Sequence, residues 1–144
     1  MAEKFSTVNM RADREKLAPE IKRSAKLCFK INKTDPTSPD IKSLIKELFN
    51  GNVADDARFM PPLHVLDGNK VKIGKNTHLN YNTTLMSSDQ ITIEDNVKIA
   101  ANCQFLANNH NLYDREKLLC APITIKNNAW LGRGSDCFSR GYNR

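Results

Sequence analysis

The spacing of aliphatic residues after Asp67 is the feature that most restricts the fold of this chain. Aliphatic or aromatic residues recur every six positions, with a two-residue slip and one longer break, and a small or β-branched residue stands four positions past most of them. Neither helical spacing nor simple strand alternation describes this pattern well. The first series is Ile73, Leu79, Leu85, Ile93, Ile99, Phe105, Ile125 and Leu131, and the second is Thr77, Thr83, Val97, Cys103, Ala129 and Ser135.

Asparagine stands three positions past many of the aliphatic residues. Because asparagine tolerates left-handed backbone conformations, it suits a corner that recurs every six residues. One hexad is then a short strand plus a corner, and three hexads close a triangular coil of about 18 residues whose aliphatic side chains stack in a column. We expect a hexapeptide-repeat parallel β-helix over residues 53–135, with a loop at 106–122. The corner residues are Asn76, Asn82, Asn96, Asn102 and Asn128.

Residues 1–52 are expected to form an N-terminal helical segment. Apolar residues recur at helical spacing from Asp13 to Lys33. Ser38 and Pro39 resemble an N-cap followed by proline at the first helical position, and Gly51 ends the second stripe. The chain is thus predicted to be mainly β, with two helices packed on the coil or on a partner.

Composition limits the partners. The 144 residues fit one domain, and the formal charge of +6 favours anionic partners without choosing among them. The basic residues are scattered without an RNA-binding pattern, so no nucleic-acid partner is expected. No apolar run reaches the roughly 20 residues of a membrane span, the start is not a secretory signal, and four distant cysteines form no CxxC pair. We expect a cytoplasmic protein with reduced thiols and no membrane partner.

Four segments together resemble the hexapeptide-repeat sugar O-acetyltransferases, the maltose, galactoside and nodulation-type enzymes. They are IKSLIKELF, PPLHVLDGNKVKIGKNTHLNYN, ITIEDNVKIAANCQFLANNH and APITIKNNAWLG, within a match from about Arg11 to Gly132. The resemblance implies a left-handed parallel β-helix, a homotrimer, acetyl-CoA as co-substrate, a sugar or similar small hydroxyl acceptor, and no metal. It also implies an active site in the cleft between neighbouring subunits.

The same resemblance assigns roles to individual residues. His110 is implied as the general base that takes a proton from the acceptor hydroxyl, a role that suits an imidazole at neutral pH. Asn80 is implied to face the acceptor and the thioester, and Trp130 to lie beside the cofactor slot. Asn82 is either a second polar group of the site or one more corner residue. Ser87 and Ser88 stand where the family often has acidic residues that hold the acceptor. Of the two, Ser88 is the expected substrate-binding residue.

The chain also departs from the family pattern. Ala12 occupies the approximate place of another acceptor-binding acid, and Asp13 is its neighbour and a possible substitute. Residues 136–144 are interpreted as an aberrant tail, because RGSDCFSRGYNR breaks the period. If the coding sequence after Gly134 is read one nucleotide later, its codons allow Ile-Val-Phe-Pro-Gly-Val-Thr-Ile. This is the pattern that the family would have next. The hypothesis is a frameshift that truncates the chain and impairs its activity.

Two other classes of function stay open. A non-catalytic remnant or interaction module would keep the coil and the trimer without the chemistry. A zinc enzyme of the hexapeptide-repeat carbonic anhydrase kind needs three converging histidines, and His64, His78 and His110 lack the closely spaced pair that such a site normally uses.

Overall fold

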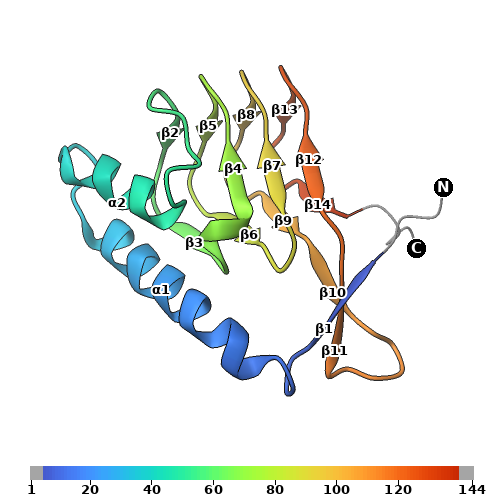
Figure 1. The fold of residues 1–144 in the computed structure, drawn as a ribbon. Helices are drawn as coiled ribbons and strands as arrows, with labels where there is room; N and C mark the ends of the chain where they lie inside the picture. Colours follow the sequence, from blue (N-terminus) through green and yellow to red (C-terminus); the bar gives the residue numbers. More distant parts are fainter. Residues whose placement is uncertain (1–4, 140–144) are drawn as a thin grey trace.

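The computed structural model describes residues 5–139, which form a mainly β fold with two helices and three parallel sheets (Figure 1). This confirms the predicted class. In chain order the elements are β1 (Ser6–Asn9), α1 (Arg14–Lys33), α2 (Asp40–Leu48), β2 (Arg58–Phe59), β3 (Leu63–Val65), η1 (Gly68–Lys70), β4 (Val71–Ile73), β5 (His78–Leu79), β6 (Thr83–Met86), β7 (Ile91–Ile93), β8 (Lys98–Ile99), β9 (Gln104–Leu106), β10 (Asn108–His110), β11 (Lys117–Cys120), β12 (Ile123–Ile125), β13 (Trp130–Leu131) and β14 (Asp136–Phe138).

Successive strands lie in successive sheets, so the chain winds around a three-sided prism. The first sheet is β12-β7-β4, the second β13-β8-β5-β2 and the third β14-β9-β6-β3. A bridge from Val53 to Ile73 begins the first turn. We call this part of the molecule the coil. Stacked residues are 20 positions apart in the sequence, as in the Asn76 to Asn96 hydrogen bond, because the two-residue slip falls at the corner between the third and first sheets.

The hexad residues form the core of the coil. Leu85 and Phe105 are fully buried, and Ile125 and Leu131 in the last turn are partly buried. Thr77 of the second series is also buried, and its hydroxyl donates to the Glu94 carbonyl at 2.6 Å. The predicted corner asparagines Asn76, Asn82, Asn96, Asn102 and Asn128 all have a positive φ, between 50° and 65°, which confirms their turn role.

The two helices cover one end and one side of the coil. Phe49, at the end of α2, stacks on Phe59 of the first turn with ring centroids 5.8 Å apart. Helix α1 packs against β3 and buries Leu27 and Ile31, whereas Leu17 and Ile21 of the predicted stripe are only half-buried. Helix α2 begins one residue later than predicted, at Asp40, whose backbone N–H donates to the Ser38 hydroxyl.

A second sheet lies outside the coil. Between β9 and β12 the chain leaves the prism over residues 107–122, which we call the excursion, and forms the hairpin β10–β11 (Figure 1). Strand β1 pairs with β11 antiparallel and completes a three-stranded sheet. The helical expectation for residues 1–52 did not include this strand. Neither helix of the described residues has the length and apolarity to cross a membrane.

The repeat continues further than the sequence pattern indicated. Strand β14 pairs in parallel with β9, and Cys137 stands opposite Phe105, six positions past Leu131. The expectation that the period breaks after Gly132 was therefore wrong for this turn. The rest of the predicted tail, with Arg140 and Tyr142, lies outside the described residues.

Candidate active site

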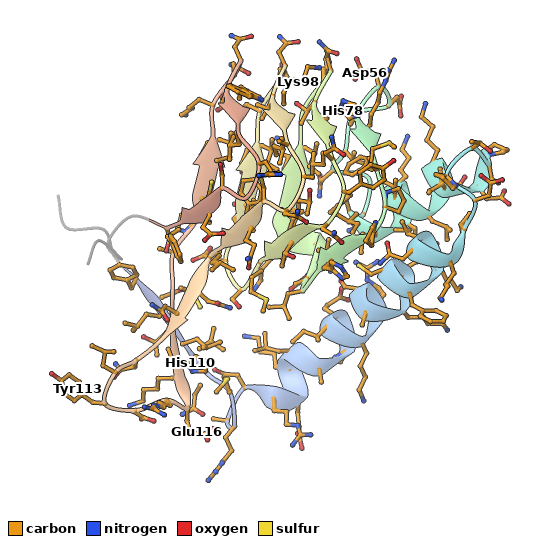
Figure 2. The ribbon with its side chains drawn as sticks, turned by 180° about the vertical axis from the view of Figure 1, so that it is seen from behind. Asp56, His78, Lys98, His110, Tyr113 and Glu116 are labelled. Carbon is orange, nitrogen blue, oxygen red and sulfur yellow. The ribbon has the colours of Figure 1, made fainter. Side chains whose placement is uncertain are left out.

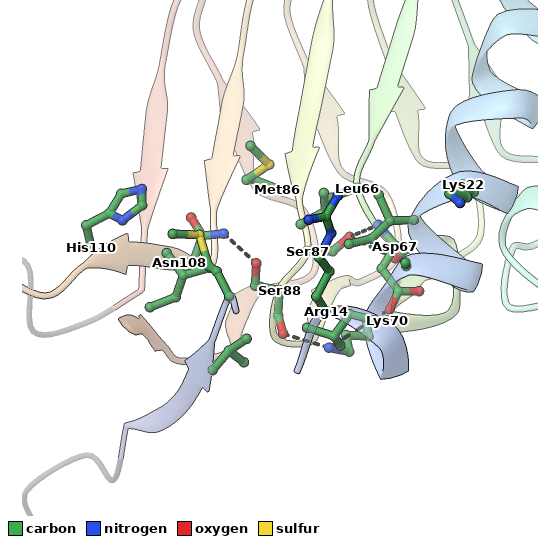
Figure 3. Close-up of a pocket in the computed structure, with 16 residues that line it drawn as sticks. Arg14, Lys22, Leu66, Asp67, Lys70, Met86, Ser87, Ser88, Asn108 and His110 are labelled. Atoms are coloured by element: carbon green, nitrogen blue, oxygen red, sulfur yellow. Dashed lines mark hydrogen bonds and ion pairs between the residues drawn. The ribbon is translucent and has the colours of Figure 1, made fainter. Parts of the chain in front are cut away.

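A pocket of about 510 Å³ lies between the first half of α1, strand β1, the excursion and one edge of the prism (Figure 3). That edge is the corner between the third and first sheets. Three successive turns contribute to it: Leu66 to Lys70 from the first, Met86 to Ser88 from the second, and the excursion from the third. The two-residue slip and the longer break in the hexads thus both fall at the pocket.

Hydrogen bonds join the three corner segments. The Ser87 hydroxyl donates to the Asp67 carbonyl at 2.8 Å and accepts from the Asp67 N–H at 3.0 Å. The Asn108 side-chain amide donates to the Ser88 hydroxyl. Lys70 Nζ donates to the Ser88 carbonyl at 2.8 Å. Because each turn is tied to the next, the polar groups of the pocket are held in place before any ligand binds.

His110 ends β10 and is exposed at one side of this pocket. Its Nδ1 lies 2.7 Å from the Arg115 carbonyl oxygen. A carbonyl can only accept, so in the neutral imidazole this contact assigns the proton to Nδ1 and leaves the lone pair on Nε2. That is the tautomer in which Nε2 can act as a general base.

The tip of the excursion holds Arg115 opposite His110. Asn111 Oδ1 accepts from the backbone N–H groups of Tyr113 at 2.9 Å and Asp114 at 3.1 Å, and Lys117 N donates to the Asp114 carbonyl at 3.0 Å. Such side-chain turns fix a short loop without burying it. Figure 2 shows His110, Tyr113 and Glu116 together on the excursion, far from His78 and Lys98 at the other end of the molecule.

Of the residues that the sequence analysis placed at the site, the structure brings His110, Ser88 and the neighbouring Ser87 to the pocket. Asn80 and Asn82 lie at the corner between the second and third sheets, and Trp130 is 77% exposed on β13 of the second sheet. Asn80 Oδ1 accepts from the Tyr81 N–H at 2.8 Å. Within one chain, these three residues do not line the pocket that contains His110.

The polar groups of Ser87 and Asp13 are both used in hydrogen bonds within the protein. Ser87 is fully buried, and its hydroxyl bonds only the backbone of the neighbouring turn. Asp13 does not line the pocket, and its carboxylate accepts from the Asn9 N–H at 2.8 Å in the turn before α1. Arg14, the next residue, does line it.

Charged groups gather on the side of the pocket away from His110. Asp67 is 8% exposed, lies 3.9 Å from Lys70 Nζ and accepts from the Asn69 N–H. Arg14 and Lys22 also line the pocket, and the side chain of neither has a hydrogen-bond or ion-pair partner among residues 5–139.

Two other kinds of chemistry can be assessed from the same residues. Burial raises the pKa of the Cys120 thiol in β11, which disfavours the thiolate that a nucleophile needs. Within the described part of the chain, no group of three or more His, Cys, Asp or Glu side chains could hold a metal ion, and His64, His78 and His110 belong to different parts of the molecule.

The sequence reasoning did not find Arg14, Lys22, Lys70 or Asn108 as pocket residues. Asn108 lies two positions before His110 in the segment that carries the resemblance, so its neighbourhood was a usable signal. Lys70 lies in another segment of the resemblance and Arg14 directly follows Asp13, whereas Lys22 had no such signal and reaches the pocket from α1.

Comparison with proteins of known name identifies the family. No family model matches the chain. The galactoside O-acetyltransferase of Escherichia coli (strain K12) is 34% identical over 115 residues, covering 76% of this chain and 56% of that protein. A Staphylococcus aureus (strain MRSA252) protein with a provisional acetyltransferase name is 36% identical over 137 residues, covering 92% of this chain and 67% of its own length. The chain thus spans about half to two thirds of these relatives.

Solved structures agree. A hexapeptide-repeat acetyltransferase of Vibrio cholerae matches with a TM-score of 0.79 and 27% identity, over 87% of this chain and 72% of that one. A galactoside acetyltransferase in complex with coenzyme A matches with a TM-score of 0.78 and 29% identity, over 87% of this chain and 64% of that one. With a relative matched over two thirds of its length and a coil of the same architecture, this chain belongs to the hexapeptide-repeat acetyltransferases, the family of the galactoside acetyltransferase to which it is similar.

Proposed function

We propose that the protein is an acetyl-CoA-dependent O-acetyltransferase that acts on a sugar or a similar small hydroxyl compound, with His110 as the general base. The observation that carries the proposal is the Nδ1 hydrogen bond to the Arg115 carbonyl, which leaves Nε2 free at the pocket. Coenzyme A is the ligand in the structure of a similar galactoside acetyltransferase, which supports acetyl-CoA as donor.

In this mechanism the chain supplies the general base and orients the acceptor. Nε2 of His110 takes the proton of the acceptor hydroxyl as the oxygen attacks the thioester carbon. The carbon–sulfur bond breaks, and the imidazolium returns its proton to the departing thiolate, so no covalent enzyme intermediate is needed. The Ser88 hydroxyl, which accepts from Asn108, can still donate to an acceptor oxygen.

We also propose that the site is completed in a homotrimer with the left-handed winding that the resemblance implies. In that arrangement Asn80 and Trp130 bind the cofactor, and Asn80 and Asn82 face the acceptor. Trp130 and Asn82 are exposed and Asn80 is half-buried, all three away from the His110 pocket, which supports this, because a second copy can present them there. An amide at Asn80 could then donate to the oxygen that becomes negative during transfer.

The test is acetyl transfer by the purified chain, followed as coenzyme A release by chromatography. His110→Ala is expected to lower kcat by roughly 10²–10⁴-fold while acetyl-CoA binding, measured by calorimetry, is retained. His64→Ala is the matched control, because His64 is exposed on β3 and does not line the pocket. A His110→Ala variant that turns over like the parent would refute the base assignment. Failure of the parent to bind acetyl-CoA would favour a non-catalytic module.

A further inference from the structure

The charge distribution of the His110 pocket points to the kind of acceptor. Its charged lining groups are the cations Arg14, Lys22 and Lys70 and the carboxylate of Asp67. Lys70 lies beside Asp67, which also accepts a backbone hydrogen bond, so the one carboxylate is already compensated. Two positive charges are then left facing the pocket without a partner in residues 5–139.

The groups are arranged at two ends. Figure 3 shows His110 and Asn108 at one side of the pocket, Lys22, Asp67 and Lys70 at the other, and Arg14 and Ser88 between them. His110 and the cations can therefore contact different parts of a bound molecule. A hydroxyl at His110 and a negative group near Arg14 and Lys22 can be engaged at the same time.

Much of the pocket lining is apolar. Its lining includes Met10, Leu17, Ile21, Leu66, Met86 and Leu118. Leu17 and Ile21 of α1 are only half-buried, so apolar surface of the helix stays available to a ligand. Since small-molecule sites combine an apolar lining with a few placed polar groups, the volume of about 510 Å³ suits a compact body of drug-like size.

We infer that the preferred acceptor carries an anionic group, a carboxylate or a phosphate, on a partly apolar body, with the reacting hydroxyl at the opposite end. This inference rests on the proposed function, because it takes the bound ligand to be the acetyl acceptor. What it adds is that Arg14 and Lys22 select a negatively charged ligand, while His110 engages its hydroxyl.

The binding test uses pairs of related probes of which one member carries an anionic group, with the full chain and without acetyl-CoA. Calorimetry compares 4-(2-hydroxyethyl)benzoate with 4-(2-hydroxyethyl)benzamide, and glucose 6-phosphate with glucose. The anionic member of at least one pair is expected to bind about tenfold more tightly, less so at high salt. The pair with the larger ratio distinguishes a carboxylate from a phosphate.

Two double variants locate the effect. Arg14→Gln with Lys22→Gln is expected to reduce the preference to within about twofold, because charge-assisted hydrogen bonds become neutral ones. Lys16→Gln with Lys26→Gln is the control, since both residues are exposed on α1, outside the pocket lining, and the change in net charge is the same. Unchanged thermal melting of both variants shows that the fold is intact.

Equal binding of charged and neutral probes would overturn the inference, and so would an equal loss of preference in the Lys16 and Lys26 control. Acetylation is then measured separately. Turnover of glucose without any preference for the anionic probes would contradict the inference alone. Selective binding of an anionic probe that is never acetylated would uphold the pocket's selectivity and contradict the proposed function.

Discussion

The coil and the excursion are built by opposite rules. In the coil, each turn repeats the one before it, strands pair in parallel, and the hexad side chains meet in a closed core. In the excursion, the two strands are antiparallel and pair with β1 from the start of the chain, and the tip side chains Leu112 and Tyr113 are 83% and 98% exposed. His110 belongs to the second region.

This difference separates stability from chemistry. The coil derives its stability from buried apolar area, which the excursion has in much smaller amount. The excursion derives its shape from local polar contacts around Asn111, which hold an exposed imidazole at a pocket. We therefore expect substitutions in the coil to change the free energy of unfolding, and substitutions in the excursion to change mainly the rate of acetyl transfer.

The largest expected effect is in the coil. Phe105→Ala removes a fully buried ring from the third turn and should lower the free energy of unfolding by about 3–5 kcal/mol, because it leaves a cavity in the column. Denaturant unfolding followed by circular dichroism measures this. Phe29→Ala, at a ring 65% exposed on α1, is the control and should change stability by less than about 0.5 kcal/mol. A loss below about 1 kcal/mol for Phe105→Ala would mean that the column is not the main source of stability.

The next effect is in the excursion and should appear as a rate. Asn111→Ala removes the acceptor of two backbone N–H groups and frees the tip that holds the Arg115 carbonyl. We expect kcat to fall about tenfold, which corresponds to about 1.4 kcal/mol in the barrier, with nearly unchanged stability. Asn111→Asp keeps the accepting oxygen and should restore most of the rate, whereas Tyr113→Ala should have no effect. If Asn111→Ala lowered the free energy of unfolding as much as Phe105→Ala, the coil and the excursion would not differ in this way.

The smallest effect concerns pH and the outer face of the coil. Partial burial, Lys98 and Arg58 lower the pKa of His78 below its ordinary value. The folded chain then binds fewer protons than the unfolded chain between the two pKa values, so stability should fall as the pH drops through about 6.5 towards the folded pKa. Thermal melting from pH 7.5 to 5 should show a shallower fall for His78→Gln, and also for Lys98→Gln. Parallel curves for the parent and His78→Gln would assign the pH dependence to other groups.

The coil could be predicted from the sequence because each of its constraints is local. An aliphatic residue every six positions and a left-handed asparagine at the corner are visible within one hexad, and the model has a positive φ at all five predicted asparagines. The last turn was missed because Cys137 is a less obvious core residue than the aliphatic one expected there.

The site could be predicted only in part. The resemblance brought out His110 and Ser88, which do line the pocket, although their roles remain predictions. It could not give β1, because the contact between Ser6 and Cys120 spans 114 positions and leaves no local pattern. The same holds for Lys22, which reaches the pocket only through the packing of α1.

One corner of the prism tolerates changes in length. Stacked residues are 20 positions apart across the first turns and 32 across the excursion, yet Ile93 and Ile125 still pair in register. Loops of different size and composition could therefore be grafted at this edge without redesigning the interior. The length and composition of one segment can thus change while the interior stays the same, which makes the excursion the natural place to begin re-engineering such a scaffold.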